Sequence, residues 1–368
     1  MKRRYPPIKL SLLLLALSLI WRMLGAPVVP GEWKSLDVPF WQARILLPSR
    51  LERVMTLWCG QMGSKSETTD QHPSEEQVAL LGAESSRPVT LQVWNAQAER
   101  LESMELEAYV YGVVAAEMPA AYHTEALKAQ AVAARTRALY QQVGTGCSLA
   151  EGADVCTQSG HCQGYATAQS LADKWGNEYE IYQRRLVEAV SATAGQVLTY
   201  DGEPILVMYH AISGGRTEDV QAVFSQSLPY LVSVDSAGEE GIRGYREDTV
   251  FSLEEAAKRL NDLFPELNTT PDDLQKTLVI ATHTATGRVE TLLLNGREIS
   301  GTDFRKALNL RSTLFTFTMD ADSITFHQTG YGHGVGMSQA GANRMAADGE
   351  GYAAILSHYY PGTALERQ

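Results

Sequence analysis

The chain has 368 residues, with 31 Lys+Arg against 43 Asp+Glu and a formal net charge of −12 at pH 7. This acidic balance argues against a nucleic-acid-binding protein. The composition, 44% hydrophobic and 20% charged with 30 Gly and 14 Pro, is that of an ordinary globular protein and excludes a disordered or fibrous chain.

Residues 1–30 are typical of a membrane-targeting segment. An apolar run from Leu10 to Trp21 continues past Arg22 to Ala26, and Pro27 follows the candidate cleavage site. This favours a retained single-pass membrane anchor, with a cleaved export signal as the alternative. The segment holds no acidic residue and five basic ones, Lys2, Arg3, Arg4, Lys9 and Arg22. The positive-inside rule then places the chain from about residue 30 onward outside the cytoplasm, at the cell membrane.

Residues 31–88 are predicted to form a stalk or linker with limited structure. Their polar stretch from Ser64 to Glu76 is too poor in apolar residues to build a core. The pattern changes at Val89, and no internal repeat follows. We predict an α+β fold, in which the N-terminal anchor helix is followed by one mixed helix and strand domain with insertions over residues 89–368.

The periodicity of apolar residues predicts the elements of this domain. The first are a β-hairpin over 89–104, a helix over 106–117 that ends before Pro119, and an Ala-rich helix over 124–142 with Thr124 as N-cap. Later ones are strands at 197–200 and 205–210, an amphipathic helix over 253–263 on an insertion, and a hairpin over 289–299. The Asn295-Gly296 pair in that hairpin suits a type I′ turn.

Glu117 closes the first helix and is the leading candidate for acid-base chemistry. A carboxyl at the end of an apolar segment is partly removed from water, which raises its pKa and lets it hold a proton near neutral pH. An ordinary helix-terminal glutamate in solvent gives the same pattern. The pattern alone leaves both interpretations open.

The Ala-rich helix carries polar and cationic candidates for substrate binding. Lys128 and Arg135 are two helical turns apart, so they share a face and are expected to reach an anionic group near the end of the preceding helix. Gln130 is a further candidate, and Arg137 adds another cation. A solvated helix flank explains the same residues.

A predicted strand with Tyr209 and His210 runs into a turn that contains Ser213, Gly214 and Gly215. The two glycines let backbone amides approach a ligand closely, and the turn is expected to expose Ser213 and Thr217. These residues are therefore candidate binding residues. A plain tight turn is the alternative.

Glycine occupies every second position from Gly330 to Gly336. In an extended chain this puts the four glycines on one face, against which another backbone or a flat sugar ring can lie. His333 and Gly334 are candidate binding residues for this reason. Ser338 is predicted to be the N-cap of a helix that begins with Gln339, so that its free amides also face the site. A purely structural tight strand is the alternative.

Three cysteines and a histidine form a candidate metal site. Cys156, His161 and Cys162 offer three soft ligands within seven residues, and Cys147 can complete a tetrahedral Cys3His zinc site. Such a closed site would be structural, because it leaves no coordination position for substrate. The alternative is a pair of disulfides that uses Cys59 as the fourth thiol.

Four separated blocks in this order resemble the stage II sporulation protein D family. They are Tyr111–Pro119, Glu125–Thr136, Ser213–Thr217 and Gly330–Gln339, and two further blocks, Leu310–Phe315 and His358–Gly362, fit the same pattern. The resemblance implies a membrane-anchored lytic transglycosylase of forespore engulfment, with the catalytic glutamate at Glu117. It also implies a zinc cluster with a Cys-x4-His-Cys core, whose fourth ligand in relatives is an upstream histidine that Cys147 replaces here.

The implied reaction cleaves the bond between N-acetylmuramic acid (MurNAc) and N-acetylglucosamine (GlcNAc) in peptidoglycan strands stripped of stem peptides. The implied partners are an amidase similar to stage II sporulation protein P and a membrane scaffold similar to stage II sporulation protein M. Glu117 would act as acid and then as base while the sugar's own 6-hydroxyl attacks, giving a 1,6-anhydro product. Lys128 and Arg135 are expected to pair with the lactyl carboxylate of muramic acid.

Two other functions fit the same residues. The domain could bind denuded glycan without cleaving it and stimulate the amidase, or it could be a metallohydrolase that uses the Cys/His cluster. Analysis of the products formed without amidase separates the first from an enzyme, and activity that survives chelation excludes the second.

Overall fold

The computed structural model describes residues 89–224 and 226–368. The predicted anchor over 1–30, the predicted stalk over 31–88 and Cys59 lie outside these ranges. Within them, no helix combines the length and the apolar character that a membrane span requires. The described chain mixes helices with short strands, which confirms the α+β class.

The elements fall into three stretches of sequence. The first contains β1 (Thr90–Asn95), β2 (Arg100–Glu105), α4 (Leu106–Glu117), α5 (Thr124–Val143), β3 (Val155–Cys156), α6 (Ala168–Trp175), η2 (Gly176–Glu178), α7 (Tyr179–Ala192), β4 (Gln196–Tyr200), β5 (Glu203–Pro204), β6 (Tyr209–His210) and α8 (Val220–Phe224). The second contains β7 (Arg246–Ser252), α9 (Leu253–Leu263), η3 (Pro265–Leu267), α10 (Pro271–Thr277), β8 (Val279–His283), β9 (Val289–Leu294), β10 (Arg297–Ser300), α11 (Gly301–Leu308), β11 (Phe315–Met319) and β12 (Ser323–Thr329). The third contains β13 (Met337–Ser338), α12 (Gln339–Ala347), α13 (Tyr352–Tyr359) and β14 (Ala364–Arg367).

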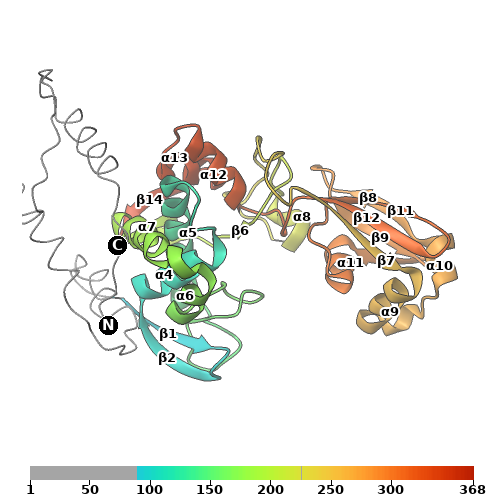
Figure 1. Ribbon diagram of the computed structural model, residues 1–368, viewed down its shortest axis with the longest axis horizontal. Helices are drawn as coiled ribbons and strands as arrows, with labels where there is room; N and C mark the ends of the chain where they lie inside the picture. Colours follow the sequence, from blue (N-terminus) through green and yellow to red (C-terminus); the bar gives the residue numbers. More distant parts are fainter. Residues whose placement is uncertain (1–88, 225) are drawn as a thin grey trace, which may run out of the picture. The chain divides into compact units, whose positions relative to one another are not determined.

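Helix α5 lies at the centre of the first hydrophobic core. It packs against α4, α7, α12, α13 and β4, and the four helices surround it in Figure 1. Its buried alanines, among them Ala129, Ala133 and Ala134, let the neighbouring helices approach closely. The helix has the predicted extent, but its N-cap is His123 instead of Thr124, because the His123 ring accepts a hydrogen bond from the amide of Glu125.

Residues 246–329 form a second hydrophobic core of their own. Strand β12 lies between β7 and β11, and β9 lies between β8 and β10. The rings of Phe304, Phe315 and Phe326 meet at centroid distances of 5.5 to 6.0 Å in this core. The predicted helix over 253–263 is present as α9, and positive φ angles at Asn295 and Gly296 confirm the predicted turn.

After β12 the chain returns to the first core. Strand β14 pairs antiparallel with β4, and the two-residue strand β13 pairs parallel with β6. The strand predicted over 205–210 is thus shortened to Tyr209–His210, since only these two residues find a ladder partner in β13. This return places α12 and α13 against α5.

Candidate active site

Glu117 is the last residue of α4 and is half-buried. Its Oε1 accepts a hydrogen bond of 2.6 Å from the amide of Gly164. Burial raises the pKa of Glu117, as the sequence predicted, while the Gly164 amide, the Gln339 side chain and the charge of Arg137 act in the opposite direction. Glu117 therefore holds its proton to a higher pH than an ordinary glutamate does.

Two residues of α5 that are seven positions apart belong to this site. The Oε1 of Gln130 accepts a hydrogen bond of 3.3 Å from the side chain of Gln339, and Gln130 is fully buried. Arg137 donates to the carbonyl of Val207, and its charge acts on Glu117, Tyr209 and His333. The sequence indicated Arg137 only as a further cation of this helix and gave it no role, although its two-turn spacing from Gln130 was a signal for one.

The predicted role of Arg135 is wrong. Its guanidinium is fully buried and makes two hydrogen bonds, of 2.6 and 2.7 Å, to the carboxylate of Glu107 at the start of α4. Lys128, on the same face, pairs with Glu125 at 2.7 Å. Arg135 thus binds the N-terminal end of α4, and the Lys128 ammonium lies over the Tyr352 ring of α13.

Replacement of Arg135 by alanine is expected to lower the free energy of unfolding by about 3–5 kcal/mol, because it leaves the Glu107 carboxylate without its cation. Urea unfolding followed by circular dichroism measures this loss. Arg184→Ala, which removes an exposed arginine from α7, is the matched control and should change stability little. A loss no larger than that of the control would contradict the structural role.

Tyr209 and Gln163 extend the site on the other side of Glu117. The Tyr209 hydroxyl donates to Gln163 Oε1 at 2.8 Å. Burial, and after it the charge of Glu117, raises the pKa of Tyr209, so this hydroxyl keeps its proton. Gln163 is buried and was not predicted, because it follows the cysteine motif directly but is not one of its candidate ligands.

His210 and His333 form a pair with ring centroids 5.7 Å apart. Burial lowers the pKa of both rings, to about 4 for His333, so both are neutral at pH 7. The Nδ1 of His210 donates to the Val335 carbonyl, which makes its Nε2 an acceptor. Among the described residues, His210 Nε2 has no hydrogen-bond partner, and neither have Gln130 Nε2 and Arg137 Nε. These buried polar atoms are available to the polar groups of a ligand.

The turn Ser213-Gly214-Gly215 does not present its groups to a ligand as predicted. Ser213 and Thr217 are fully buried, and the amides of Ser213 and Gly214 point at the carboxylate of Glu239. Gly214 and Gly215 have φ angles of 84° and 106°, which explains why glycine occupies both positions. The group that the turn encloses is thus a side chain of the protein itself.

The segment Gly330–Gly336 is not a regular extended strand with one bare glycine face. All four of its glycines have positive φ, and the segment packs against the backbone around β6. A Cβ on Gly336 would lie 2.0 Å from the Met208 carbonyl oxygen, and one on Gly334 would lie 2.6 Å from the Arg288 guanidinium. The sequence predicted that either another backbone or a flat sugar ring lies against these glycines. A backbone lies against Gly330, Gly332 and Gly336.

Ser338 is the N-cap of α12, as predicted, since its Oγ accepts from the amide of Gly341. It is fully buried, so it is not an open binding residue. Its position fixes Gln339, the first residue of α12, beside Glu117 and Gln130.

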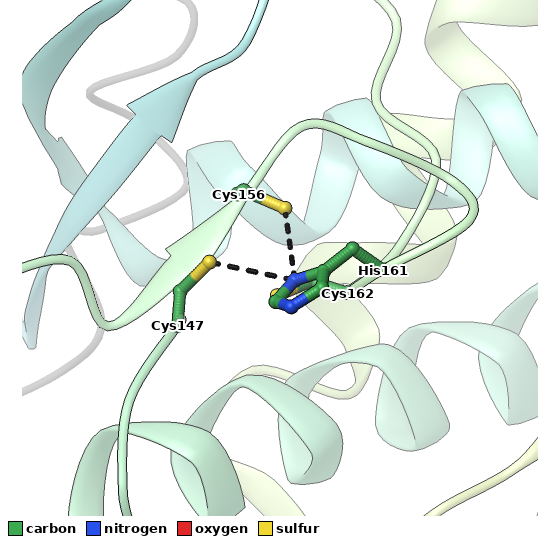
Figure 2. Close-up of side chains that lie close together, drawn as sticks. All are labelled: Cys147, Cys156, His161 and Cys162. Atoms are coloured by element: carbon green, nitrogen blue, oxygen red, sulfur yellow. Dashed lines mark hydrogen bonds between the residues drawn. The ribbon is translucent and has the colours of Figure 1, made fainter. Parts of the chain in front are cut away.

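The predicted metal ligands meet in one cluster (Figure 2). The ligand atoms of Cys147, Cys156, His161 and Cys162 all lie within 4.8 Å of one another. His161 Nδ1 is 3.5, 3.6 and 3.3 Å from the sulfurs of Cys147, Cys156 and Cys162, and its Nε2 bonds to Ser148. A tetrahedral zinc with bonds of about 2.3 Å to sulfur and about 2.0 Å to nitrogen would separate these atoms by about 3.5 Å. The four residues therefore fit a zinc ion.

The cysteine cluster is connected to Glu117 by two residues of backbone. Gln163 and Gly164 follow Cys162 directly, and they supply the acceptor for Tyr209 and the amide for Glu117. A Cβ on Gly164 would lie 2.9 Å from Glu117 Oε1, so a larger residue here would push the carboxylate away from the amide. The loop that carries the cluster thus determines the environment of Glu117.

Residues 95–200, which contain Glu117 and the Cys/His cluster, match the family model described as "Stage II sporulation protein". This places the fold and the site in the class of stage II sporulation proteins. The chain is 35% identical to stage II sporulation protein D of Bacillus subtilis (strain 168) over 289 residues, 78% of this chain and 82% of that protein. It is also 35% identical to stage II sporulation protein D of Bacillus amyloliquefaciens over 278 residues, 76% and 79% of the two chains. The chain belongs to the stage II sporulation protein D family.

A third relative has a different name. The amidase enhancer of Bacillus subtilis (strain 168) is 28% identical over 304 residues, 69% of this chain and 40% of that protein.

Proposed function

We propose that this protein is a lytic transglycosylase that cleaves the MurNAc-GlcNAc bond of peptide-stripped peptidoglycan strands during forespore engulfment. The observation that carries the proposal is Glu117, a half-buried carboxyl whose pKa burial raises. Among the described residues, the only charged side chain that acts on its pKa is Arg137. A lytic reaction needs one carboxyl of this kind, because the same group serves as acid and then as base.

The chemistry follows from the groups around Glu117. Its proton goes to the leaving oxygen of GlcNAc as the C1–O bond of MurNAc breaks, and oxocarbenium-like charge develops at C1. The 6-hydroxyl of the same MurNAc then attacks C1 and returns its proton to Glu117, which closes the 1,6-anhydro ring. The amide of Gly164 holds the carboxyl between these steps.

Arg137 replaces Arg135 as the cation for substrate. The protein has a net charge of −12, and its substrate carries the lactyl carboxylates of muramic acid, so bulk attraction cannot capture the strand. Arg137 lies at the site, and its Nε has no partner within the described part of the chain. We propose that it pairs with the lactyl carboxylate that removal of the stem peptide exposes.

The remaining parts of the proposal concern location, partners and the metal. Residues 1–30 would anchor the protein in the cell membrane with the domain outside, beside an amidase similar to stage II sporulation protein P and a scaffold similar to stage II sporulation protein M. Cys147, Cys156, His161 and Cys162 would hold a structural zinc, which would fix the loop that leads to Gly164.

A second candidate is a denuded-glycan-binding activator of a cell-wall amidase. The similarity to a protein named amidase enhancer favours it. In that case the groups around Glu117 would bind the strand without proton transfer.

Digestion of peptide-free glycan strands by the purified protein, without amidase, separates the two functions. Mass spectrometry is expected to detect fragments that end in 1,6-anhydro-MurNAc. They are lighter than hydrolysis products by one water, about 18 mass units, because no water is added. Intact strands that bind but are not cut would favour the activator. Hydrolysed ends would contradict the lytic mechanism.

A further inference from the structure

Glu239 is a fully buried carboxylate that accepts five hydrogen bonds. Its Oε2 accepts from the amide and the hydroxyl of Ser213, both at 2.9 Å, and from the amide of Gly214 at 3.0 Å. Its Oε1 accepts from the hydroxyls of Ser236 and Ser338, at 2.8 and 2.5 Å. An acceptor-only group surrounded by five donors suits a carboxylate, and its loss leaves several buried donors without a partner.

These bonds join segments that are far apart in the sequence. Ser213 follows β6, Ser338 ends β13, and Ser236 also bonds to the hydroxyl of Tyr359 in α13 at 2.7 Å. A Cβ on Gly341 in the first turn of α12 would lie 2.1 Å from the Tyr359 hydroxyl oxygen, so this helix packs directly on the network. One side chain therefore fixes the ends of both strands of the β13-β6 sheet.

The same two strands lead to the site residues. In the parallel ladder Tyr209 faces Met337 and His210 faces Ser338. Ser338 is followed by Gln339, whose side chain donates to Gln130 and lowers the pKa of Glu117. A shift at Ser338 would be passed to Gln339, and a shift at Ser213 would be passed to Tyr209 and His210.

We propose that Glu239 is a positioning residue, which aligns Gln339 and Tyr209 with Glu117 by holding Ser213 and Ser338 in place. The proposal rests on the proposed function for its kinetic consequence. Glu239 lies outside all the sequence blocks that mark the family resemblance, and it touches neither Glu117 nor the cysteine cluster in the contacts described above. It acts through Ser213 and Ser338.

The test compares Glu239→Gln with Glu240→Gln, which removes the same charge from an exposed neighbour. Glu239→Gln is expected to lower kcat on peptide-free strands by about 10- to 100-fold, with KM changed little, because misplaced groups cost rate more than binding. Hydrogen exchange is expected to be faster in peptides that cover 211–216 and 336–343 and unchanged over 246–263, in the second core. Glu240→Gln should behave as wild type in both measurements.

Ser338→Ala is the second variant, because it removes one donor to Glu239 and the N-cap bond to Gly341 but leaves the other four bonds to Glu239. It should reproduce the slower turnover and the faster exchange over 336–343, even where Glu239→Gln unfolds. Wild-type kcat, or wild-type exchange at both segments, in a folded Glu239→Gln or Ser338→Ala protein overturns the positioning role.

Failure of the proposed function is recognised separately, since wild type then yields no anhydro product. In that event the exchange measurement still decides, and unchanged exchange over 211–216 and 336–343 in a folded Glu239→Gln protein overturns the proposal.

Discussion

Glu117→Gln is expected to abolish formation of 1,6-anhydro products from peptide-free strands, with a fall in turnover of about 10³-fold. The amide keeps the size of the side chain and can still accept the hydrogen bond from Gly164, but it has no proton to give to the leaving oxygen. Binding of the strands should be retained. Mass spectrometry of the digests and a strand-binding assay measure the two quantities on one protein preparation.

The matched control is Glu188→Gln, which removes an exposed carboxyl from α7 and should leave turnover unchanged. Retained cleavage by Glu117→Gln would refute its role as acid and base. Joint loss of cleavage and strand binding would point to a damaged site.

The free energy of unfolding of Glu117→Gln is also expected to depend on pH differently from that of wild type. Burial raises the native pKa of Glu117 above its unfolded value, so the native state binds this proton more tightly. The stabilisation is complete below the unfolded pKa and is lost as pH rises through the native pKa. Glu117→Gln lacks this titration, so its free energy of unfolding relative to wild type should increase as pH rises through that window. Urea unfolding at several pH values measures the difference.

Loss of the metal is expected to have the second-largest effect. Cys156→Ser should lower the free energy of unfolding by about 3 kcal/mol or more, because a structural metal contributes its binding free energy to folding. Turnover should fall as well, since the loop from Cys162 to Gly164 supplies the amide that bonds to Glu117. Metal analysis of protein purified without chelators should find one zinc in wild type and none in the variant.

Cys59→Ser distinguishes a metal site from a disulfide framework. With zinc bound by Cys147, Cys156, His161 and Cys162, this change should leave stability, zinc content and turnover as in wild type. An effect of Cys59→Ser that is as large as that of Cys156→Ser, together with an absence of zinc in wild type, would instead establish the disulfides.

The Ala-rich helix shows what the periodicity of the sequence predicts and what it leaves open. Its extent and the two-turn spacing of its cations were both correct from the sequence. The two-turn spacing holds for Lys128 and Arg135 and equally for Gln130 and Arg137. Only the packing of α4 and β4 against α5 decides which of these pairs lies near Glu117. Arg135 is buried with Glu107, and Arg137 remains at the site.

The two glycine motifs show a related limit. The sequence indicated correctly that glycine is needed there for close approach, but it could not say what approaches. The structure assigns the Ser213–Gly215 turn to Glu239 and three of the Gly330–Gly336 glycines to the backbone around β6. Glu239 and Gln163 had no motif of their own, because each depends on a distant partner, Ser213 for Glu239 and Tyr209 for Gln163, which lie 26 and 46 positions away.

The sequence by itself determined the elements and the chemistry of single residues. The α+β class, the helices over 106–117, 124–142 and 253–263, the turn at Asn295-Gly296 and the cap at Ser338 all depend on neighbours along the chain. The sequence blocks that carry the family resemblance were also recognised from the sequence alone. Tertiary structure alone decided which polar groups meet Glu117, because the return of the chain after residue 329 pairs β13 with β6 and sets Gln339 beside Gln130. Contacts of that kind depend on packing between distant segments, and no local pattern encodes them.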